Sequence, residues 1–146
     1  MTLTLFTIGY EKLLPEPLVH ELGAAGVRRV IDVRFRPQSR RPGMSKTRLG
    51  DLLGEHGIRY EHRRALGTPA DLRVLYRAGR IPEAHAAFAA HVEARSSEAL
   101  DALAAELPTA VPTALLCLEA DPHVCHRSVL VERLRARVGH FDVVDL

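Results

Sequence analysis

Short apolar runs alternate with helical patterns along this chain, and the alternation constrains the fold more than any other feature of the sequence. Five runs are short enough for β-strands and are bounded by glycine, proline or charged residues, at 3–8, 27–34, 58–62, 113–119 and 141–144. Between them, leucines and other apolar residues recur at the spacing of helical turns. The pattern predicts an α/β fold of the Rossmann-like, three-layer kind, with a mostly parallel sheet of about five strands and helices on both faces.

The helical patterns lie at 15–25, 47–56, 70–78 and 83–95, and a further helix follows Ser96 or Ser97. The last helix runs to Gly139, and Asp121 with Pro122 is typical of an N-cap followed by proline at the first helical position. This start places Cys125 near the first turn of that helix. The run 113–119 is almost continuously apolar, which predicts a central strand that is covered on both faces.

A chain of 146 residues with 47% hydrophobic residues is expected to form one α/β domain over 1–146. No apolar run approaches the roughly 20 residues of a membrane span, so no membrane partner is expected. The first residues lack the basic stretch and long apolar segment of a signal peptide, and two cysteines are too few for a disulfide scaffold. These features predict a cytoplasmic protein, and they leave the oligomeric state open.

Basic residues cluster in one segment, although the formal net charge is only +2. Between Val33 and Gly50 the chain has no acidic residue and six basic ones, namely Arg34, Arg36, Arg40, Arg41, Lys46 and Arg48. A basic segment in a nearly neutral chain indicates a local anion site rather than a surface coated for nucleic acid. The scarcity of aromatic residues, with no tryptophan, argues against a stacking surface for single-stranded nucleic acid.

Polar and reactive residues follow the ends of four predicted strands. Ligands of open α/β sheets bind outside the carboxyl ends of the strands, so these residues are the first candidates for a site. The candidates are Gly9 and Tyr10 after the first strand, Asp32, Arg34, Ser39 and Arg40 after the second, Tyr60 and His62 at the third, and Cys117, Glu119, Asp121, Cys125, His126 and Arg127 at the fourth.

Each candidate role has a structural alternative. Cys125, beside His126 and Arg127, is predicted to be a nucleophile or redox thiol, and its alternative is a small packed side chain. Cys117 is more easily explained as core, but it becomes a resolving thiol if the two sulfur atoms meet. Asp32 and Glu119 are candidates for a general base or orienting group. Their alternative is an ion pair that fixes a loop, Asp32 with Arg34 or Glu119 with Arg127.

No nucleotide-binding motif of the P-loop or dinucleotide type is present, and no arginine follows either cysteine at the spacing of a cysteine-phosphatase loop. No cofactor is firmly implied. Zinc is a candidate ion, because Cys117, Glu119, His123, Cys125 and His126 offer enough donor atoms, although they match no tight zinc-knuckle spacing.

The chain resembles a bacterial and archaeal family known as domain of unknown function four-eight-eight. The resemblance is carried by six motifs in the family's order, namely Thr7-Ile8-Gly9, Asp32-Val33-Arg34 with Pro37, Ser39 and Arg40, Gly57-Ile58 with Tyr60, Leu66-Gly67, Cys117-x-Glu119, and Cys125-His126-Arg127. Tyr10-Glu11 and Thr68 stand where the family usually has a His-Ser pair and a second glycine. The resemblance implies a compact α/β fold in which the Cys-Glu-Cys-His-Arg cluster faces the Asp-Arg-Ser-Arg loop, and it supplies no reaction.

Three functions are compatible with these residues. The first is a small enzyme acting on an anionic, phosphate- or nucleotide-like ligand. Its catalytic residues would be Cys125, Glu119, Asp32 and His126, and its substrate-binding residues Gly9, Tyr10, Arg34, Ser39, Arg40 and Arg127. The second is a nucleic-acid-binding module that uses the basic loop 34–48. The third is a metal-binding protein with a Cys-Glu-Cys-His cluster.

Overall fold

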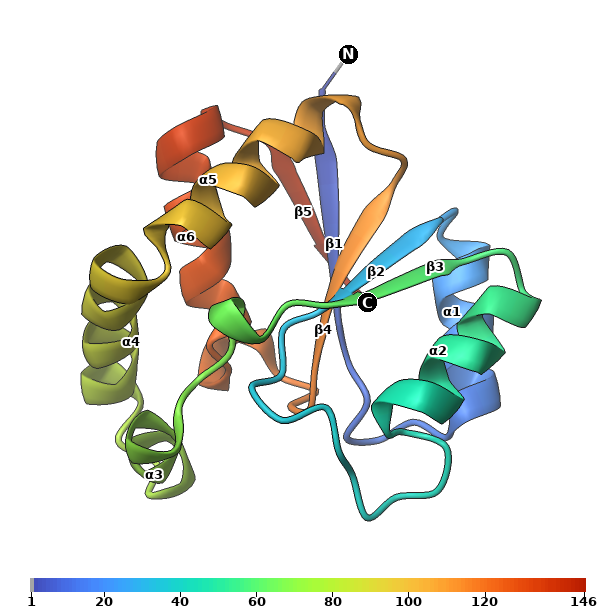
Figure 1. Cartoon of the computed structure of the whole chain (residues 1–146), viewed down its shortest axis with the longest axis horizontal. Coiled ribbons are helices and arrows are strands. Elements are labelled where there is room, and N and C mark those ends of the chain that lie inside the picture. The colour runs from blue at the N-terminus through green and yellow to red at the C-terminus, as the bar shows by residue number, and fades with distance from the viewer. Residues whose placement is uncertain (1) are drawn as a thin grey trace.

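A computed structural model describes residues 2–146, and in this part of the chain it contains five strands, six α-helices and three 3₁₀ helices (Figure 1). The elements, in chain order, are β1 (Thr4–Gly9), α1 (Pro15–Ala24), β2 (Arg29–Asp32), α2 (Lys46–Glu55), β3 (Arg59–His62), η1 (Arg64–Leu66), α3 (Ala70–Arg77), α4 (Ile81–Arg95), α5 (Ser97–Glu106), η2 (Leu107–Thr109), β4 (Thr113–Cys117), η3 (Pro122–Val124), α6 (Arg127–Val138) and β5 (Asp142–Asp145). The predicted alternation of strands and helices along the chain is confirmed.

The five strands form one parallel sheet in the order β3-β2-β4-β1-β5. All five residues of β4 are buried, as the continuous apolar run predicts for a central strand. The register places Cys117 at the end of β4 opposite Gly9 of β1, and Leu116 opposite Asp32 of β2. The chain segments that follow these three strands therefore begin at neighbouring points on one edge of the sheet.

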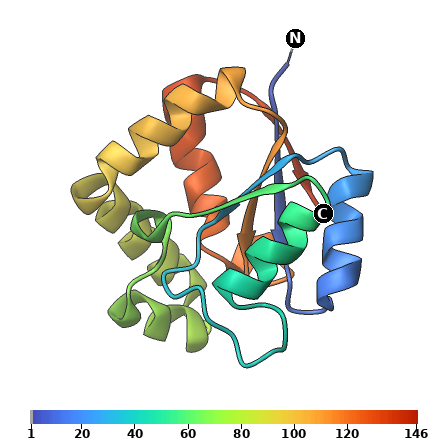
Figure 2. The ribbon, with the colours of Figure 1, turned by 45° about the vertical axis from the view of Figure 1, so that its right-hand side comes forward.

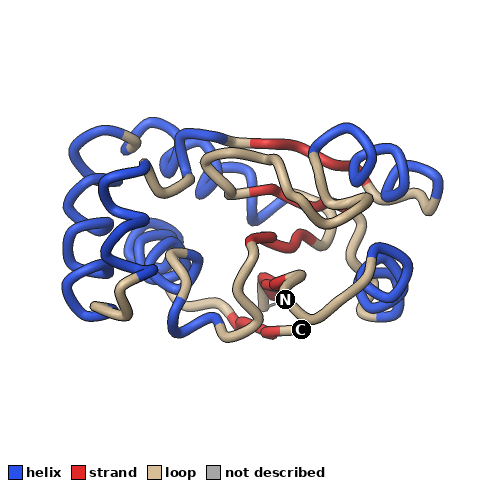
Figure 3. The backbone as a smooth tube through the Cα atoms, turned by 90° about the horizontal axis from the view of Figure 1, so that it is seen from below, coloured by secondary structure: helices blue, strands red, loops and turns tan. Residues whose placement is uncertain are grey.

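Helices cover both faces of the sheet, which confirms the predicted three layers (Figures 1, 2 and 3). On one face, α1 and α2 pack through Leu18, Leu22 and Leu49 onto Ile8 and its neighbours. On the other face, α4, α5 and α6 contribute to a second apolar cluster, with Phe88, Leu100 and Leu130 among its members. Among the residues described, no helix has both the length and the apolar character needed to cross a bilayer.

The adjacent strands β2 and β4 are followed by connections that run to opposite faces of the sheet. The chain leaves β2 towards α2 on one face and leaves β4 towards α6 on the other. Adjacent parallel strands whose connections diverge in this way leave a crevice at their carboxyl ends, and this is the usual ligand position in open α/β sheets. The loop after β2 and the turn after β4 lie together at the lower edge of the sheet in Figure 1.

The start of the last helix differs from the prediction. Asp121 is a cap, but it caps only the single turn η3, where its side chain accepts a hydrogen bond from the main-chain N–H of His123 at 2.9 Å. Cys125 is then extended, with φ −127° and ψ 146°, and α6 begins at Arg127. Cys125 therefore precedes the helix instead of lying in its first turn.

Candidate functional site

A cavity of about 700 Å³ opens at the carboxyl ends of the central strands. Its walls come from the segment after β2, the segment around β4 and η3, and helix α3. The lining residues are Tyr10, Arg34, Phe35, Arg36, Gln38, Arg40, Thr68, Arg73, Tyr76, Arg77, Cys117, Leu118, Glu119, Val124, Cys125 and His126. The cysteine cluster and the basic loop thus face one another across this cavity, as the family resemblance implies.

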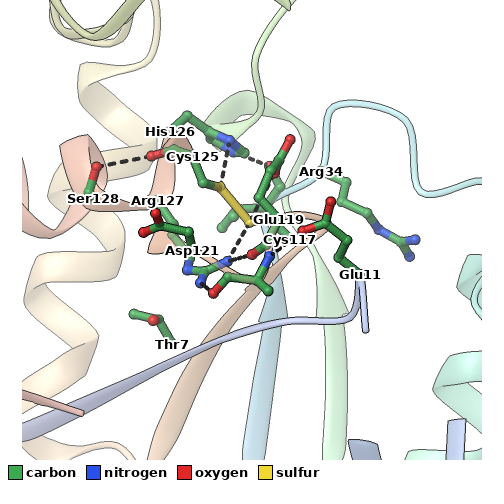
Figure 4. Close-up of a disulfide and its surroundings, with 12 residues drawn as sticks. Thr7, Glu11, Arg34, Cys117, Glu119, Asp121, Cys125, His126, Arg127 and Ser128 are labelled. Atoms are coloured by element: carbon green, nitrogen blue, oxygen red, sulfur yellow. Dashed lines mark hydrogen bonds between the residues drawn. A yellow bond between two sulfur atoms is a disulfide. The ribbon is translucent and has the colours of Figure 1, made fainter. Parts of the chain in front are cut away.

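The two cysteines form a disulfide in the wall of the cavity (Figure 4). Cys117 is the last residue of β4, and the extended backbone of Cys125 brings its sulfur back towards that strand across a separation of 8 residues. Both residues are 1% exposed. The two alternatives for Cys117 therefore coincide, because it is buried in the core and its sulfur also meets that of Cys125.

Arg127 lies beneath the disulfide with its side chain fully buried. Its Nη1 atom donates to the Cys117 sulfur at 2.8 Å and to the main-chain oxygen of Glu119 at 2.6 Å, and Nη2 donates to the main-chain oxygen of Ala120 at 3.1 Å. The alternative ion pair with the Glu119 carboxylate is thus replaced by bonds to main-chain oxygens. Arg127 enters none of the ion pairs formed within residues 2–146, so a thiolate at Cys117 would be its nearest anionic partner.

Glu119 is the one carboxylate among the residues that line the cavity. Its Oε2 atom lies 3.6 Å from the Cys117 sulfur, and burial raises the pKa of the Glu119 carboxyl. A carboxyl group with a raised pKa beside a thiol can accept the thiol's proton and return it. The donor atoms of Cys117, Glu119 and Cys125 also lie within 4.8 Å of one another, which is close enough for a shared metal ion when the sulfurs are reduced.

His126 adjoins the second sulfur. Its Nε2 atom lies 2.8 Å from the main-chain oxygen of Val33, so Nε2 carries the hydrogen and Nδ1 is the acceptor that faces the Cys125 sulfur at 3.6 Å. Burial lowers the pKa of His126 to about 4, and its ring packs edge-on against Phe88. The imidazole is therefore neutral near pH 7 and accepts a hydrogen bond from a reduced Cys125.

Asp32 and Arg34 form the buried ion pair that was the structural alternative for both residues. Arg34 donates through Nη2 to the Asp32 carboxylate at 2.7 Å, and the hydroxyl of Tyr60 donates to the same oxygen. The other guanidinium nitrogen, Nη1, donates to the main-chain oxygen of Met44 at 2.8 Å and to the hydroxyl of Tyr10 at 3.3 Å. The pair ties the loop after β2 to the sheet, and Asp32 is not among the lining residues.

The remaining predicted substrate-binding residues divide into two groups. Tyr10 and Arg40 line the cavity with Arg34, whereas Gly9, Ser39 and Arg127 do not. Ser39 exchanges hydrogen bonds with Ser45 inside the loop. Gly9 has a packing role, because a Cβ atom there would lie 1.7 Å from the main-chain oxygen of Glu119.

Arg41 also belongs to the structure of the loop and not to the cavity. Its guanidinium donates to the main-chain oxygens of Tyr10, Glu11 and Leu13, three residues of the segment after β1. Arg34 and Arg41 are therefore two of the six basic residues of segment 34–48 whose guanidinium groups bind other parts of the protein.

Sequence reasoning missed the wall that α3 supplies. Arg73, Tyr76 and Arg77 lie on this helix and line the cavity, as does Thr68 just before it. The positions of Arg73 and Arg77, one helical turn apart on a predicted helix, indicated a basic face. Nothing in the pattern indicated that this face turns towards the cysteines.

Comparison with known proteins gives one match. Residues 15–134 match the family described as Domain of unknown function DUF488, so the match includes α1 through most of α6 and omits β1 and β5. No curated protein and no solved structure matches the chain. Because the match covers well over half of its length, the chain belongs to the DUF488 family.

Proposed function

We propose that this protein is a small thiol enzyme that exchanges electrons with an anionic substrate through Cys117 and Cys125. The observation that carries the proposal is the meeting of the two sulfur atoms in the wall of a cavity that several arginines also line. A purely structural disulfide has no need of a neighbouring imidazole acceptor, a carboxyl group with a raised pKa and a guanidinium donor. Here all three contact the sulfurs.

Cys125 is the sulfur that reacts with the substrate, and Cys117 is the resolving sulfur. When an external thiolate attacks the Cys125 sulfur, the bond to Cys117 breaks and the electron pair stays on Cys117. The Nη1 donor of Arg127, 2.8 Å from that sulfur, stabilises the thiolate that is expelled. A leaving thiolate that is stabilised in this way makes exchange faster.

The opposite direction begins with the reduced protein and a substrate disulfide. The Cys125 thiolate attacks one substrate sulfur, forms a mixed disulfide and releases the first half of the substrate as a thiolate. The Cys117 thiolate then attacks the Cys125 sulfur, forms the protein disulfide and releases the second half. Two electrons pass from the protein to the substrate, and the two released thiolates take up the two thiol protons. A low-molecular-weight thiol or a protein dithiol would restore the reduced protein.

Each sulfur has a hydrogen-bond acceptor beside it. The carboxyl of Glu119 serves Cys117 at 3.6 Å, and its raised pKa suits it to hold the proton between steps. His126 faces Cys125 at the same distance, and with a pKa of about 4 it accepts a hydrogen bond instead of storing the proton. In this proposal Asp32 is a positioning residue that acts through Arg34 and the loop after β2.

Oxidised glutathione, an anionic disulfide, tests the proposal. Added to the reduced wild-type protein, it should be converted to reduced glutathione, and mass spectrometry should find the protein disulfide without an adduct. The Cys117→Ser variant should stop at a stable glutathione adduct on Cys125, and the Cys125→Ser variant should react far more slowly. A Cys125→Ser variant that consumes oxidised glutathione at the wild-type rate would refute the assignment of Cys125.

A metal site is the second candidate, and the proximity of the three donor groups Cys117, Glu119 and Cys125 favours it. Two thiolates and a carboxylate suit Zn²⁺, with a water molecule as the fourth ligand. The sulfurs can bind the ion only after the disulfide is reduced. Metal analysis of reduced protein purified without a histidine tag tests this candidate, and zinc well below one equivalent would refute it. Nucleic-acid binding by the loop 34–48 stays an untested prediction.

A further inference from the structure

The outer part of the cavity is rich in arginine side chains that have no acidic partner. Arg36, Arg73 and Arg77 all line it, and none of them enters an ion pair within the described residues 2–146. Burial lowers the pKa of Arg73, and the positive charges of Arg36 and Arg77 lower it further, so Arg73 lies close enough to both guanidinium groups to be repelled by each. Such a group of like charges is stabilised when an anion binds among them.

Two buried donors at the same wall have no acceptor. The Nε atom of Arg73 and the hydroxyl of Thr68 are both covered from solvent and have no hydrogen-bond partner in the structure. Thr68 is 4% exposed, and both residues line the cavity. Buried polar groups in folded proteins are almost always paired, and both of these donors belong to residues that line the cavity, so an anion bound there would supply the acceptor that each of them lacks.

The arginine group differs from two of the three arginines that sequence reasoning assigned to the substrate, while the third, Arg40, also lines the cavity and enters no ion pair within residues 2–146. Arg34 is bound to Asp32 and Arg127 to main-chain oxygens, so neither guanidinium is available to a ligand. Arg73 is held close to Phe35, with its Cζ atom 5.9 Å from the centre of the ring. This contact restricts the guanidinium without neutralising its charge.

We propose that Thr68, Arg36, Arg73 and Arg77 form a subsite for a phosphate or diphosphate group, and that the substrate of the thiol site is a phosphorylated disulfide or thiol. The statement that the substrate is a thiol or disulfide rests on the proposed function. The phosphate subsite does not depend on it. A carboxylate is satisfied by one bidentate arginine, whereas a phosphate group has the charge and the oxygen atoms for several guanidinium groups and a hydroxyl. Leu118 and Val124 also line the cavity, and their exposed side chains offer apolar contacts to the rest of the molecule.

Binding of inorganic pyrophosphate to the oxidised protein tests the subsite, because the oxidised protein has no thiol to react. Isothermal titration calorimetry at constant ionic strength should show pyrophosphate binding more tightly than phosphate. Loss of a charge-assisted hydrogen bond in Arg73→Gln should weaken binding at least about tenfold. Thr68→Val, which keeps the shape and removes the hydroxyl, should weaken it by about fivefold.

Arg95→Gln is the matched control. Arg95 is exposed in the last turn of α4, does not line the cavity and enters no ion pair within the described residues. Its replacement should leave the affinity unchanged, and circular dichroism should show all variants folded. If Arg73→Gln binds pyrophosphate as tightly as the wild type, or if the wild type does not bind it, the subsite is refuted.

The two proposals fail in different ways. If pyrophosphate does not bind but oxidised glutathione still oxidises the reduced protein, the subsite is wrong and the thiol function stands. If pyrophosphate binds at Arg73 but neither cysteine variant changes the reaction with glutathione, the subsite stands and the thiol function is wrong.

Discussion

Reduction of the Cys117–Cys125 disulfide should weaken the fold only modestly. The two residues are 8 positions apart, and the loop-closure entropy of so short a loop corresponds to about 2.5 kcal/mol. Both cysteines belong to the apolar cluster on the α4–α6 face, but many other buried residues make up that cluster, and the cluster on the opposite face contains neither cysteine. The reduced protein should therefore stay folded.

One contact in the structure is expected to stabilise the reduced protein and so to act in the opposite direction. After reduction, Arg127 is next to a Cys117 sulfur that can become a thiolate, and this gives the buried guanidinium an anionic partner. The pairing offsets part of the lost loop constraint, so about 2.5 kcal/mol is an upper figure. For a chain of 146 residues it corresponds to a fall in Tm of about 8 °C.

Urea unfolding followed by circular dichroism measures the difference, since the chain has no tryptophan to report by fluorescence. The oxidised protein and the same protein with a phosphine reductant should differ by at most about 2.5 kcal/mol in the free energy of unfolding. Cys125→Ala, which forms no disulfide, should show no difference between the two conditions. Unfolding on reduction, or a loss above about 4 kcal/mol, would identify a structural bond and refute the reasoning that this pair cycles.

Three further predictions concern the groups that hold the site together. Gly9→Ala should destabilise the protein by about 3 kcal/mol in urea unfolding, because the added Cβ would overlap the main-chain oxygen of Glu119; a change near zero would contradict the rigid packing of that loop. Asp32→Asn should lose about 3 kcal/mol by the same measurement, because it leaves the buried Arg34 without its charge partner, whereas an unchanged midpoint would show that the pair is dispensable. For His126, the folded pKa of about 4 lies below the ordinary 6.5, so protonation favours the unfolded chain. About 3 kcal/mol of stability should be present above pH 6.5 and lost as the pH falls to 4, and unfolding of His126→Gln should lack this part of the pH dependence.

The parallel sheet follows from local patterns, whereas the facing of the cysteine cluster and the basic loop was implied by the family resemblance. The run 113–119 has the apolar continuity of a strand covered on both sides, and β4 is the central strand. Parallel strands end at a common edge, so the rule for ligand sites placed the strand-end residues on one side of the sheet. That Cys117 and Arg34 begin adjacent segments depends on the pairing of β2 with β4, and the sequence patterns did not predict the strand order.

Those patterns did not predict the conformations of the loops. An Asp-Pro pair such as Asp121-Pro122 can cap either a single 3₁₀ turn or a long helix. Here the extended backbone of Cys125 ends the turn, so the helix does not start at Asp121. The direction in which α3 turns its arginines depends on how α3 packs against α4, and that contact is not encoded in the period of either helix. The positions of the arginines along α3 were therefore predictable from the sequence, but their positions relative to the two sulfurs were not.

The arginines show why a cluster of charge in a sequence does not by itself identify a binding site. Arg34 and Arg41 belong to the same basic segment as Arg36, yet an aspartate and three main-chain oxygens take up their donors. Within residues 2–146 Arg36 enters no ion pair, and it lines the cavity together with Arg73, which comes from another element of the chain. The charge available to a ligand is what remains after internal acceptors have been assigned, and that assignment requires the fold. A change at Arg34 is therefore expected to act on stability, and a change at Arg73 on ligand affinity.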